Sequence, residues 1–399
     1  MSIDRRNFIK LLGTSLILSA CRTGPLPLPT PEPTAAAEAT ATNQPPAAPA
    51  TAAPATATGT ATTVPPTTVP GAPTATAAPA TATAAATATA APTTAPAPAA
   101  TPVALATRIS SNIDFYVQTY SGEPNLNANQ WSLQVTGLVS NPTTLRLNDI
   151  KALQSGAQMR TLECIGNPVG GSQIGNTNWK GALFTAFAEK VGMKPNASWV
   201  VLSGDDGYFT SVPLAKLMNA NTLMVYEMGG EALPRGHGFP LRMLIPDVYG
   251  QKQPKWLVKV EFTDHEAVGT WEEKGWSHEA TINPNAIIDT PTENQKLSGQ
   301  VYVIKGVAFA SQVGVAKVEV STDRGRTWNL AQIQHGPSNL VWTMWAYPWL
   351  LPASGKNTIV ARVTDANGKV QAKIGSVLAD TFPDGAKDMH SVTVEVKNA

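Results

Sequence analysis

The chain has 399 residues, a formal net charge of +1 at pH 7 and 14% charged residues. This balance gives no electrostatic reason to expect nucleic acid or an acidic partner. The composition is uneven: residues 22–102 are nearly all Ala, Thr and Pro, whereas all ten Trp lie at or beyond Trp131 and all five His at or beyond His237. About 300 residues remain for folded structure, which is enough for two domains.

The first 21 residues indicate export. Residues 4–10 (DRRNFIK) resemble a twin-arginine motif, and the apolar run at 11–18 is too short to span a membrane as a stable helix. Residues 18–21 (LSAC) resemble a bacterial lipobox that ends in Cys21. An ordinary secretion signal with an incidental cysteine is the alternative. We expect residues 1–21 to be a signal peptide and the protein to be extracytoplasmic, held at the cell membrane by a lipid on Cys21.

Residues 22–102 predict a disordered tether, because an Ala/Thr/Pro-rich composition cannot bury a core. About 80 residues of flexible chain have a mean reach of about 50 Å, so the tether would let an anchored domain stand off from the membrane. If Cys21 carries lipid, Cys164 has no disulfide partner within the chain, since there are two cysteines. A lone thiol in an oxidising compartment requires burial, a metal or a redox role.

The first folded unit, residues 103–286, mixes short strands with short helices. Apolar and alternating runs predict strands, and helical spacing followed by Gly192 predicts a helix stop. The pattern lacks regular βαβ alternation, so we expect an α+β domain. The predicted strands are 131–135, 161–163, 199–202, 223–226 and 243–245, and the predicted helices are 147–153 and 182–191.

The second unit, residues 287–399, alternates more regularly. Its short strands, separated by turn signals, predict an immunoglobulin-like sandwich without the cysteine pair of antibody domains. The alternating runs are 301–307, 315–320, 358–363 and 392–396, and the turn signals are 323–325, 353–355 and 365–368.

Cys164 is the only cysteine in the two folded units. A strand-like lead-in delivers its thiol into a turn, residues 166–171, that is rich in Gly, Asn and Pro. A soft thiolate at such a turn suits a soft metal. A small buried free cysteine is the alternative.

The segment 223–257 concentrates cations. His237 and Arg242 lie in a Gly/Pro-rich loop, and Lys252 and Lys255 follow a second turn. An arginine fork together with lysine point charges can hold a phosphorylated cofactor. A solvated surface loop is the alternative, and it fits poorly because these cations are set among Pro, Trp and apolar residues.

These segments resemble the sulfite oxidase family of molybdopterin-dependent oxidoreductases. Residues 227–242 (EMGGEALPRGHGFPLR), with 245–250 (IPDVYG) and 255–257 (KWL), are similar to its molybdopterin-binding core. Residues 162–167 (LECIGN) resemble its molybdenum–cysteine motif. Residues 287–399 resemble its immunoglobulin-like dimerisation domain, which implies a homodimer.

The resemblance implies a molybdenum–molybdopterin cofactor, with Cys164 as the metal ligand and the catalytic residue. One implied cofactor contact is an acidic residue at Asp205, but Asp206 stands next to it, so which of the two makes the contact stays open. The predicted twin-arginine export is consistent with this cofactor, because that route carries folded protein and this family acquires its cofactor in the cytoplasm. The implied cofactor-binding residues are Tyr116, Gln118, Thr119, Tyr120, Asp205, His237, Arg242, Gln253, Pro254 and Lys255.

The chain departs from the family where sulfite oxidases hold their anionic substrate with arginines and a tyrosine. It has Gln118 and Val169 at two of those positions and, by a looser alignment, Trp276 at a third, with acidic residues 272 and 273 nearby. We therefore expect a pocket less cationic than a sulfite site. Cys21 and Cys164 are too far apart in the sequence to form a Cys-x-x-Cys-His haem motif, so we expect electrons to pass to or from a separate protein, such as a cytochrome.

The sequence therefore predicts two-electron oxo transfer on a small molecule other than sulfite. The direction stays open and includes reduction of S-oxides or N-oxides, as in the periplasmic methionine sulfoxide reductase branch of the family. Sulfite oxidation is an alternative, since Arg160 or Arg235 could fold inward. A non-catalytic surface lipoprotein that uses the inherited fold for binding is another, although Cys164, His237 and Arg242 argue against it.

Overall fold

The computed structural model describes residues 102–371 and 381–398. The predicted signal peptide, Cys21 and the tether up to residue 101 lie outside the described residues. None of the described helices is long and apolar enough to cross a bilayer.

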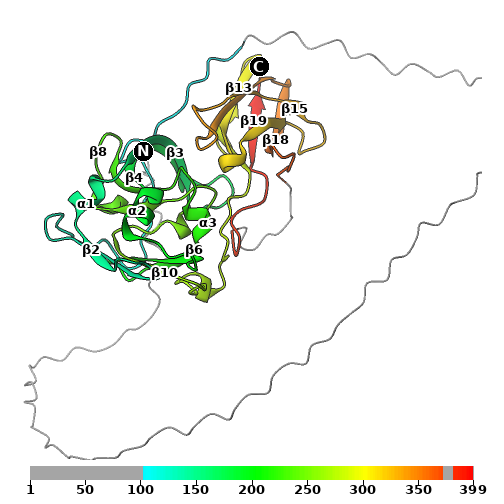
Figure 1. Cartoon of the computed structure of the whole chain (residues 1–399). Coiled ribbons are helices and arrows are strands. Elements are labelled where there is room, and N and C mark those ends of the chain that lie inside the picture. Colours follow the sequence, from blue (N-terminus) through cyan, green and yellow to red (C-terminus); the bar gives the residue numbers. More distant parts are fainter. Residues whose placement is uncertain (1–101, 372–380, 399) are drawn as a thin grey trace, which may run out of the picture. The chain divides into compact units, whose positions relative to one another are not determined.

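Two five-stranded sheets build the first part of the described chain, coloured cyan to green in Figure 1. One has the strand order β2-β1-β10-β5-β6, and the other is β3-β4-β7-β8 with β9 paired to β7. Strand β1 runs parallel to β10, whereas the other pairs are antiparallel. The strands are β1 (Leu133–Gly137), β2 (Thr143–Leu145), β3 (Ser155–Glu163), β4 (Ile174–Leu183), β5 (Trp199–Gly204), β6 (Phe209–Pro213), β7 (Leu223–Met228), β8 (Glu231–Ala232), β9 (Arg242–Leu244) and β10 (Leu257–Thr263).

Three short helices belong to this part: α1 (Leu147–Lys151), α2 (Phe184–Val191) and α3 (Leu214–Leu217). Helix α2 buries Phe184 and Phe187, which contact the ring of Phe262 on β10. Its predicted stop is confirmed, since Gly192 has φ +66°, a conformation that glycine adopts without steric penalty. The strands dominate, so the predicted α+β class holds in a β-rich form.

Two further sheets build the second part, coloured yellow to red in Figure 1. Their strand orders are β11-β13-β17-β16 and β12-β19-β18-β14-β15. Side chains from both sheets, including Trp345, Val318, Ile359 and Val394, share one apolar core. The strands are β11 (Asn285–Thr290), β12 (Lys296–Leu297), β13 (Val301–Phe309), β14 (Val315–Ser321), β15 (Asn329–Leu330), β16 (Gln332–Gln334), β17 (Thr343–Leu350), β18 (Ser354–Asp365) and β19 (Ser391–Lys397).

Two details of the second part differ from the expected pattern. The predicted boundary at 286/287 falls inside β11, and residues 354 and 355 of a predicted turn already belong to β18. The two-sheet arrangement agrees with a sandwich, while its immunoglobulin-like class stays a prediction.

The N-terminal arm, residues 102–120, forms no helix or strand yet contacts both parts of the described chain. Val103 exchanges hydrogen bonds with the Gln332 side chain, and Arg108 forms a salt bridge with Asp289 and lies over the ring of Trp342. Phe115 is the arm's only buried residue, 3% exposed, and packs edge-on against Trp179 of β4. The arm then delivers residues 116–120 to the cavity described below.

Candidate active site

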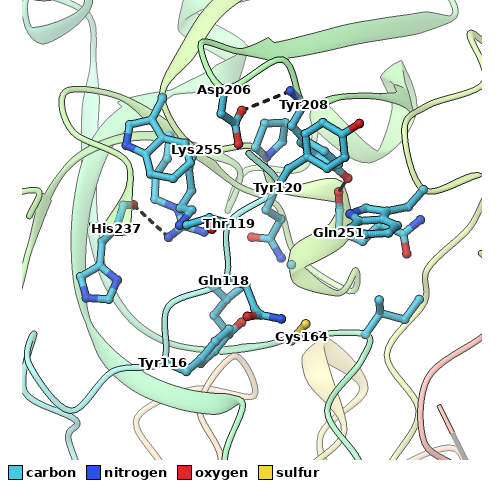
Figure 2. Close-up of a pocket in the computed structure, with 18 residues that line it drawn as sticks. Tyr116, Gln118, Thr119, Tyr120, Cys164, Asp206, Tyr208, His237, Gln251 and Lys255 are labelled. Carbon is cyan, nitrogen blue, oxygen red and sulfur yellow. Dashed lines mark hydrogen bonds between the residues drawn. The ribbon is translucent and has the colours of Figure 1, made fainter. Parts of the chain in front are cut away.

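A cavity forms where the N-terminal arm meets the end of β3, the β5–β6 loop and the segment 235–256 (Figure 2). The structure brings together implied cofactor-binding and metal-binding residues that come from four separate segments of the chain. Those that line the cavity are Tyr116, Gln118, Thr119, Tyr120, Cys164, His237, Arg242, Gln253, Pro254 and Lys255.

Asp205 is the exception among the implied residues. It is exposed and does not line the cavity, whereas its neighbour Asp206 does. The β5–β6 turn explains the register: the Asp205 amide donates to the Trp256 carbonyl at 2.9 Å, and the Asp206 carboxylate accepts from the Tyr208 amide at 3.2 Å. The acidic side chain in the cavity is therefore that of Asp206.

Cys164 is the first residue after β3, at the point where the strand pair ends. Its amide donates to the Gln173 carbonyl at 3.0 Å, and its own carbonyl accepts from the Asn167 amide at 3.0 Å. The thiol is free and half-buried, and it faces the cavity. Burial raises the pKa of the Cys164 thiol, so a soft metal that binds this sulfur must displace a proton.

The buried Glu163 carboxylate stabilises the turn that follows Cys164. It accepts one hydrogen bond from Asn167 in the turn and one from Asn285 of β11, each at 3.0 Å. Burial raises the pKa of Glu163 to about 7, although both amides act to lower it. The contact ties the cysteine turn to the second part of the chain.

One side of the cavity is basic, formed by Arg242 and Lys255 with the neutral imidazole of His237 beside them. Figure 2 shows His237 and Lys255 together on the left of the view. The His237 ring nitrogen Nε2 donates to the Asn112 carbonyl at 2.8 Å, and burial lowers the pKa of the imidazole, so it is neutral at pH 7. Arg242 Nη1 donates to the His237 carbonyl at 3.1 Å. Lys255 Nζ donates to the Gly236 carbonyl at 2.6 Å.

These cations have no acidic partner close enough for an ion pair. Among residues 102–371 and 381–398, no salt bridge includes Arg242 or Lys255. Burial lowers the pKa of Arg242 to about 10, and burial followed by the charge of Arg242 lowers the pKa of Lys255 to about 7. Buried charge that lacks a counter-charge is unfavourable, so this side of the cavity is built for an anionic group.

Another part of the cavity is aromatic. Tyr120, Tyr208 and Trp271 line it, and the ring of Tyr120 lies 6.1 Å from that of Tyr208 and 6.0 Å from that of Trp271. Tyr120 and Tyr208 lie to the right of His237 and Lys255 in Figure 2. The Tyr208 hydroxyl donates to the Gln251 carbonyl, which fixes its ring. Lys274 Nζ lies over the rings of Trp271 and Tyr120, at 4.4 and 5.1 Å from their centroids.

Lys252 lies outside the cavity, although it follows the same turn as Lys255. Its ammonium forms a fully buried salt bridge with Glu272 and donates to the Thr210 hydroxyl at 3.2 Å and the Ser211 carbonyl at 3.1 Å. Burial acts to raise the pKa of Glu272, but the charge of Lys252 and its hydrogen bonds outweigh burial and hold it below its ordinary value. The positive charge of Lys252 is thereby neutralised.

Of the three positions where the chain departs from sulfite oxidases, only Gln118 lines the cavity. Val169 and Trp276 do not, and Trp276 packs edge-on against Phe382 instead. The two arginines that could have restored charge are turned elsewhere. Arg160 is buried and donates to the Asn221 carbonyl at 3.3 Å, and Arg235 donates to the Pro124 carbonyl at 3.0 Å.

Sequence reasoning missed Tyr208 and Trp271. Tyr208 lies two residues after Asp206 in the same turn, and this proximity could have indicated that its ring lines the cavity. Trp271 stands beside Glu272, whose pairing with Lys252 depends on a contact between distant segments. Nothing in the sequence alone distinguishes Trp271 from Trp276.

Comparison with known proteins defines the class. Residues 120–271 match the oxidoreductase molybdopterin binding domain, and residues 277–379 match the Mo-co oxidoreductase dimerisation domain. The chain is 36% identical over 147 residues to the uncharacterized oxidoreductase YuiH of Bacillus subtilis, covering 37% of this chain and 72% of that protein. The chain is thus an enzyme that belongs to the class of molybdopterin-dependent oxidoreductases.

Two further comparisons narrow the family. Mitochondrial sulfite oxidase of Rattus norvegicus is 28% identical over 311 residues, which cover 66% of this chain and 57% of that protein. The structure of the sulfane dehydrogenase SoxCD from Paracoccus pantotrophus shares the fold, with a TM-score of 0.64 at 20% identity over 72% of this chain and 81% of that chain. The chain belongs to the sulfite oxidase family, whose cofactor is molybdenum–molybdopterin.

Proposed function

We propose that the protein is an extracytoplasmic molybdenum enzyme that transfers an oxygen atom to or from a small neutral molecule, with Cys164 as the protein ligand to the metal. The observation that carries this proposal is the lining of the cavity. Arg242 and Lys255, which form no salt bridge in the described chain, line it together with the aromatic side chains Tyr120, Tyr208 and Trp271 and the carboxylate of Asp206. A free thiol faces the space that they enclose.

The residues present fit the cofactor. Arg242 and Lys255 would hold its phosphate, because they line the cavity and form no salt bridge in the described chain. Gln253, whose side chain receives and donates hydrogen bonds within the loop at 2.9 and 2.7 Å, would keep that loop rigid. Cys164 would supply a soft sulfur ligand. The bound cofactor supplies two-electron oxygen-atom transfer, and the protein positions it and shapes the pocket.

A neutral substrate follows from the charges. A dianion such as sulfite must exchange strong hydration for fixed positive charge. Gln118 is uncharged, Val169 lies outside the cavity, and Arg160 and Arg235 bond elsewhere. Losing one buried charge-assisted contact costs about 1.5–3 kcal/mol. A sulfoxide or N-oxide is free of this penalty.

The proposed reaction balances with a separate electron donor or acceptor. In the reducing direction, the oxygen of the sulfoxide or N-oxide leaves as water with two protons, and an electron-transfer protein supplies two electrons. In the oxidising direction, water supplies the oxygen, and the same number of protons and electrons leaves. Because the sequence contains no Cys-x-x-Cys-His haem motif, a partner such as a cytochrome would carry the electrons.

The test is steady-state kinetics on molybdenum-loaded protein. A panel of S-oxides and N-oxides is assayed with reduced viologen, beside sulfite with an artificial acceptor. We expect reductase turnover and weak or no sulfite turnover. Sulfite oxidation with a micromolar KM, and no reductase activity, would instead establish sulfite oxidation, the activity that the similarity to rat sulfite oxidase favours.

A further inference from the structure

The aromatic side of the cavity is assembled from two segments that are far apart in sequence. Tyr120 comes from the N-terminal arm, and Trp271 from the loop that follows β10. Their rings meet edge to face at 86°, and Tyr120 remains 43% exposed, so this pair forms the rim of the cavity. We call Tyr120 and Trp271 the aromatic rim.

Two lysines stand near the rim, and neither lines the cavity. The ammonium of Lys274 lies over the rings of Tyr120 and Trp271, and Lys252 is neutralised by Glu272. Because Tyr120 and Trp271 line the cavity and Lys274 does not, the rim presents ring surface to the cavity, whereas Arg242 and Lys255 lie elsewhere in its lining. An anionic cofactor end suits the cations, and a neutral apolar body suits the rim.

The loop that carries Trp271 is held firmly from below. The Thr270 amide donates to the Phe209 carbonyl at 3.0 Å, and the Phe209 amide donates to the Thr270 hydroxyl at 3.1 Å. Directly after Trp271, Glu272 is bound by Lys252 and by the Thr210 hydroxyl, the latter at 2.8 Å. A Cβ on Gly269 would come within 2.5 Å of the Glu272 carboxylate, so the loop backbone and this carboxylate are tightly packed.

Together these contacts assign a role to the loop. We propose that Trp271, with Tyr120, is the specificity-determining contact for the apolar or aromatic body of the substrate, and that the buried Lys252–Glu272 pair positions it. The proposal rests on the proposed oxo-transfer function and deepens it: the substrate class becomes sulfoxides or N-oxides that bear a bulky apolar substituent.

The selectivity test compares methyl phenyl sulfoxide with dimethyl sulfoxide on the molybdenum-loaded enzyme. The wild-type enzyme should favour the phenyl compound, and Trp271→Leu should lower the ratio of the two kcat/KM values about tenfold or more, mainly through KM. Trp276→Leu is the matched control, because Trp276 is also half-buried on the same loop but does not line the cavity. An unchanged ratio in Trp271→Leu, or an equal fall in Trp276→Leu, would overturn the assignment.

Binding of unreactive sulfones separates this proposal from the proposed function. Calorimetry should show methyl phenyl sulfone binding to the wild-type holoenzyme more tightly than dimethyl sulfone, with the difference lost in Trp271→Leu. If no S-oxide or N-oxide is turned over but this difference persists, the reaction assignment fails and the rim assignment stands. If turnover occurs but the affinity difference between the two sulfones is the same in Trp271→Leu as in the wild type, the rim assignment is wrong and the reaction assignment stands.

The positioning part needs its own variants. Glu272→Gln leaves the buried Lys252 charge unpaired, so the double variant Lys252→Met/Glu272→Leu is made beside it to keep the fold. The protein is labelled with 5-fluorotryptophan, and the fluorine NMR signal of Trp271 is assigned by its loss in Trp271→Leu. This signal should broaden or shift in either variant. The preference for methyl phenyl sulfoxide over dimethyl sulfoxide should fall in the same variants. A wild-type signal and wild-type selectivity in both variants would contradict positioning by this pair.

Discussion

At the scale of single residues, Lys255 shows most clearly how the cavity is prepared for an anion. Its ammonium donates to a backbone carbonyl and lies 4.2 Å from the centroid of the Trp256 ring, but no carboxylate of the described residues forms a salt bridge with it. Trp256 itself adopts φ +51°, a conformation that bulky residues seldom take and that often marks functional sites. The charged form of Lys255 is therefore unfavourable in the cofactor-free protein, and a bound phosphate would stabilise it.

This charge gives the cofactor-free protein a particular pH dependence. The pKa of Lys255 falls from its ordinary 10.5 to about 7 on folding. Between pH 7 and pH 10 the unfolded chain holds a proton on this amine that the folded protein has lost, so stability rises with pH in that window. In chemical denaturation, Lys255→Met should remove part of that rise.

Lys259→Met is the matched control, because Lys259 is half-buried like Lys255 but already pairs with Glu261 at 2.7 Å. Its profile should follow that of the wild type. A Lys255→Met profile that runs parallel to the wild type from pH 7 to pH 10 would contradict the account of an unpaired buried amine.

Residue types and spacing singled out Cys164, His237, Arg242 and Lys255, and the resemblance to the family implied the other predicted lining residues. Cys164, His237 and Arg242 stand in short segments whose order along the chain is itself a signal. The rest depends on turns and on distant contacts. The choice between Asp205 and Asp206 is decided by one backbone hydrogen bond to Trp256, and the exclusion of Lys252 from the cavity by its salt bridge with Glu272.

At the scale of elements, the N-terminal arm is the piece that closes the site. It forms a turn but no helix or strand, yet it supplies Tyr116, Gln118, Thr119 and Tyr120 to the cavity. Its position depends on side chains, foremost Phe115, whose ring fills the space left by the missing Cβ of Gly175.

Phe115→Ala should therefore destabilise the protein by about 3–5 kcal/mol in urea denaturation, as expected for a buried phenylalanine. Ile113→Ala, two residues away and 92% exposed, should change stability by less than about 0.5 kcal/mol. Limited proteolysis should cut the arm faster in Phe115→Ala alone. Equal stability of the two variants would mean that Phe115 does not anchor the arm.

Strand β4 shows why some elements escaped sequence reasoning. Its sequence, IGNTNWKGAL, is polar and contains two glycines, which argues against a strand. It forms because β3 and β7 pair with both of its edges. Its buried Asn176 is satisfied by the Arg108 carbonyl of the arm, 2.9 Å away. Such long-range compensation leaves no local pattern to detect.

At the scale of the whole molecule, the match of residues 277–379 to a dimerisation domain supports a homodimer. Sedimentation equilibrium at micromolar concentration should therefore give twice the chain mass of 41.9 kDa, less the processed signal peptide. A single-chain mass under the same conditions would contradict a stable dimer.

Anchoring is the second prediction at this scale. The motifs at residues 4–10 and 18–21 support export and lipid attachment at Cys21. Cys21→Ala should move the protein from the membrane fraction to the soluble extracytoplasmic fraction, or leave its signal peptide unprocessed. A variant that is processed and still fractionates with membranes as the wild type does would refute the lipid anchor.

The central claim is that the cavity holds the molybdenum cofactor through Cys164, and elemental analysis with absorption spectroscopy tests it most directly. Wild-type protein produced in a molybdate-supplied host should contain one molybdenum per chain. Cys164→Ser should remain folded but lose or shift the sulfur-to-metal absorption bands and lose turnover, because an alkoxide is a harder ligand than a thiolate. Folded wild-type protein without molybdenum, or a Cys164→Ser variant with the wild-type spectrum and activity, would contradict the account.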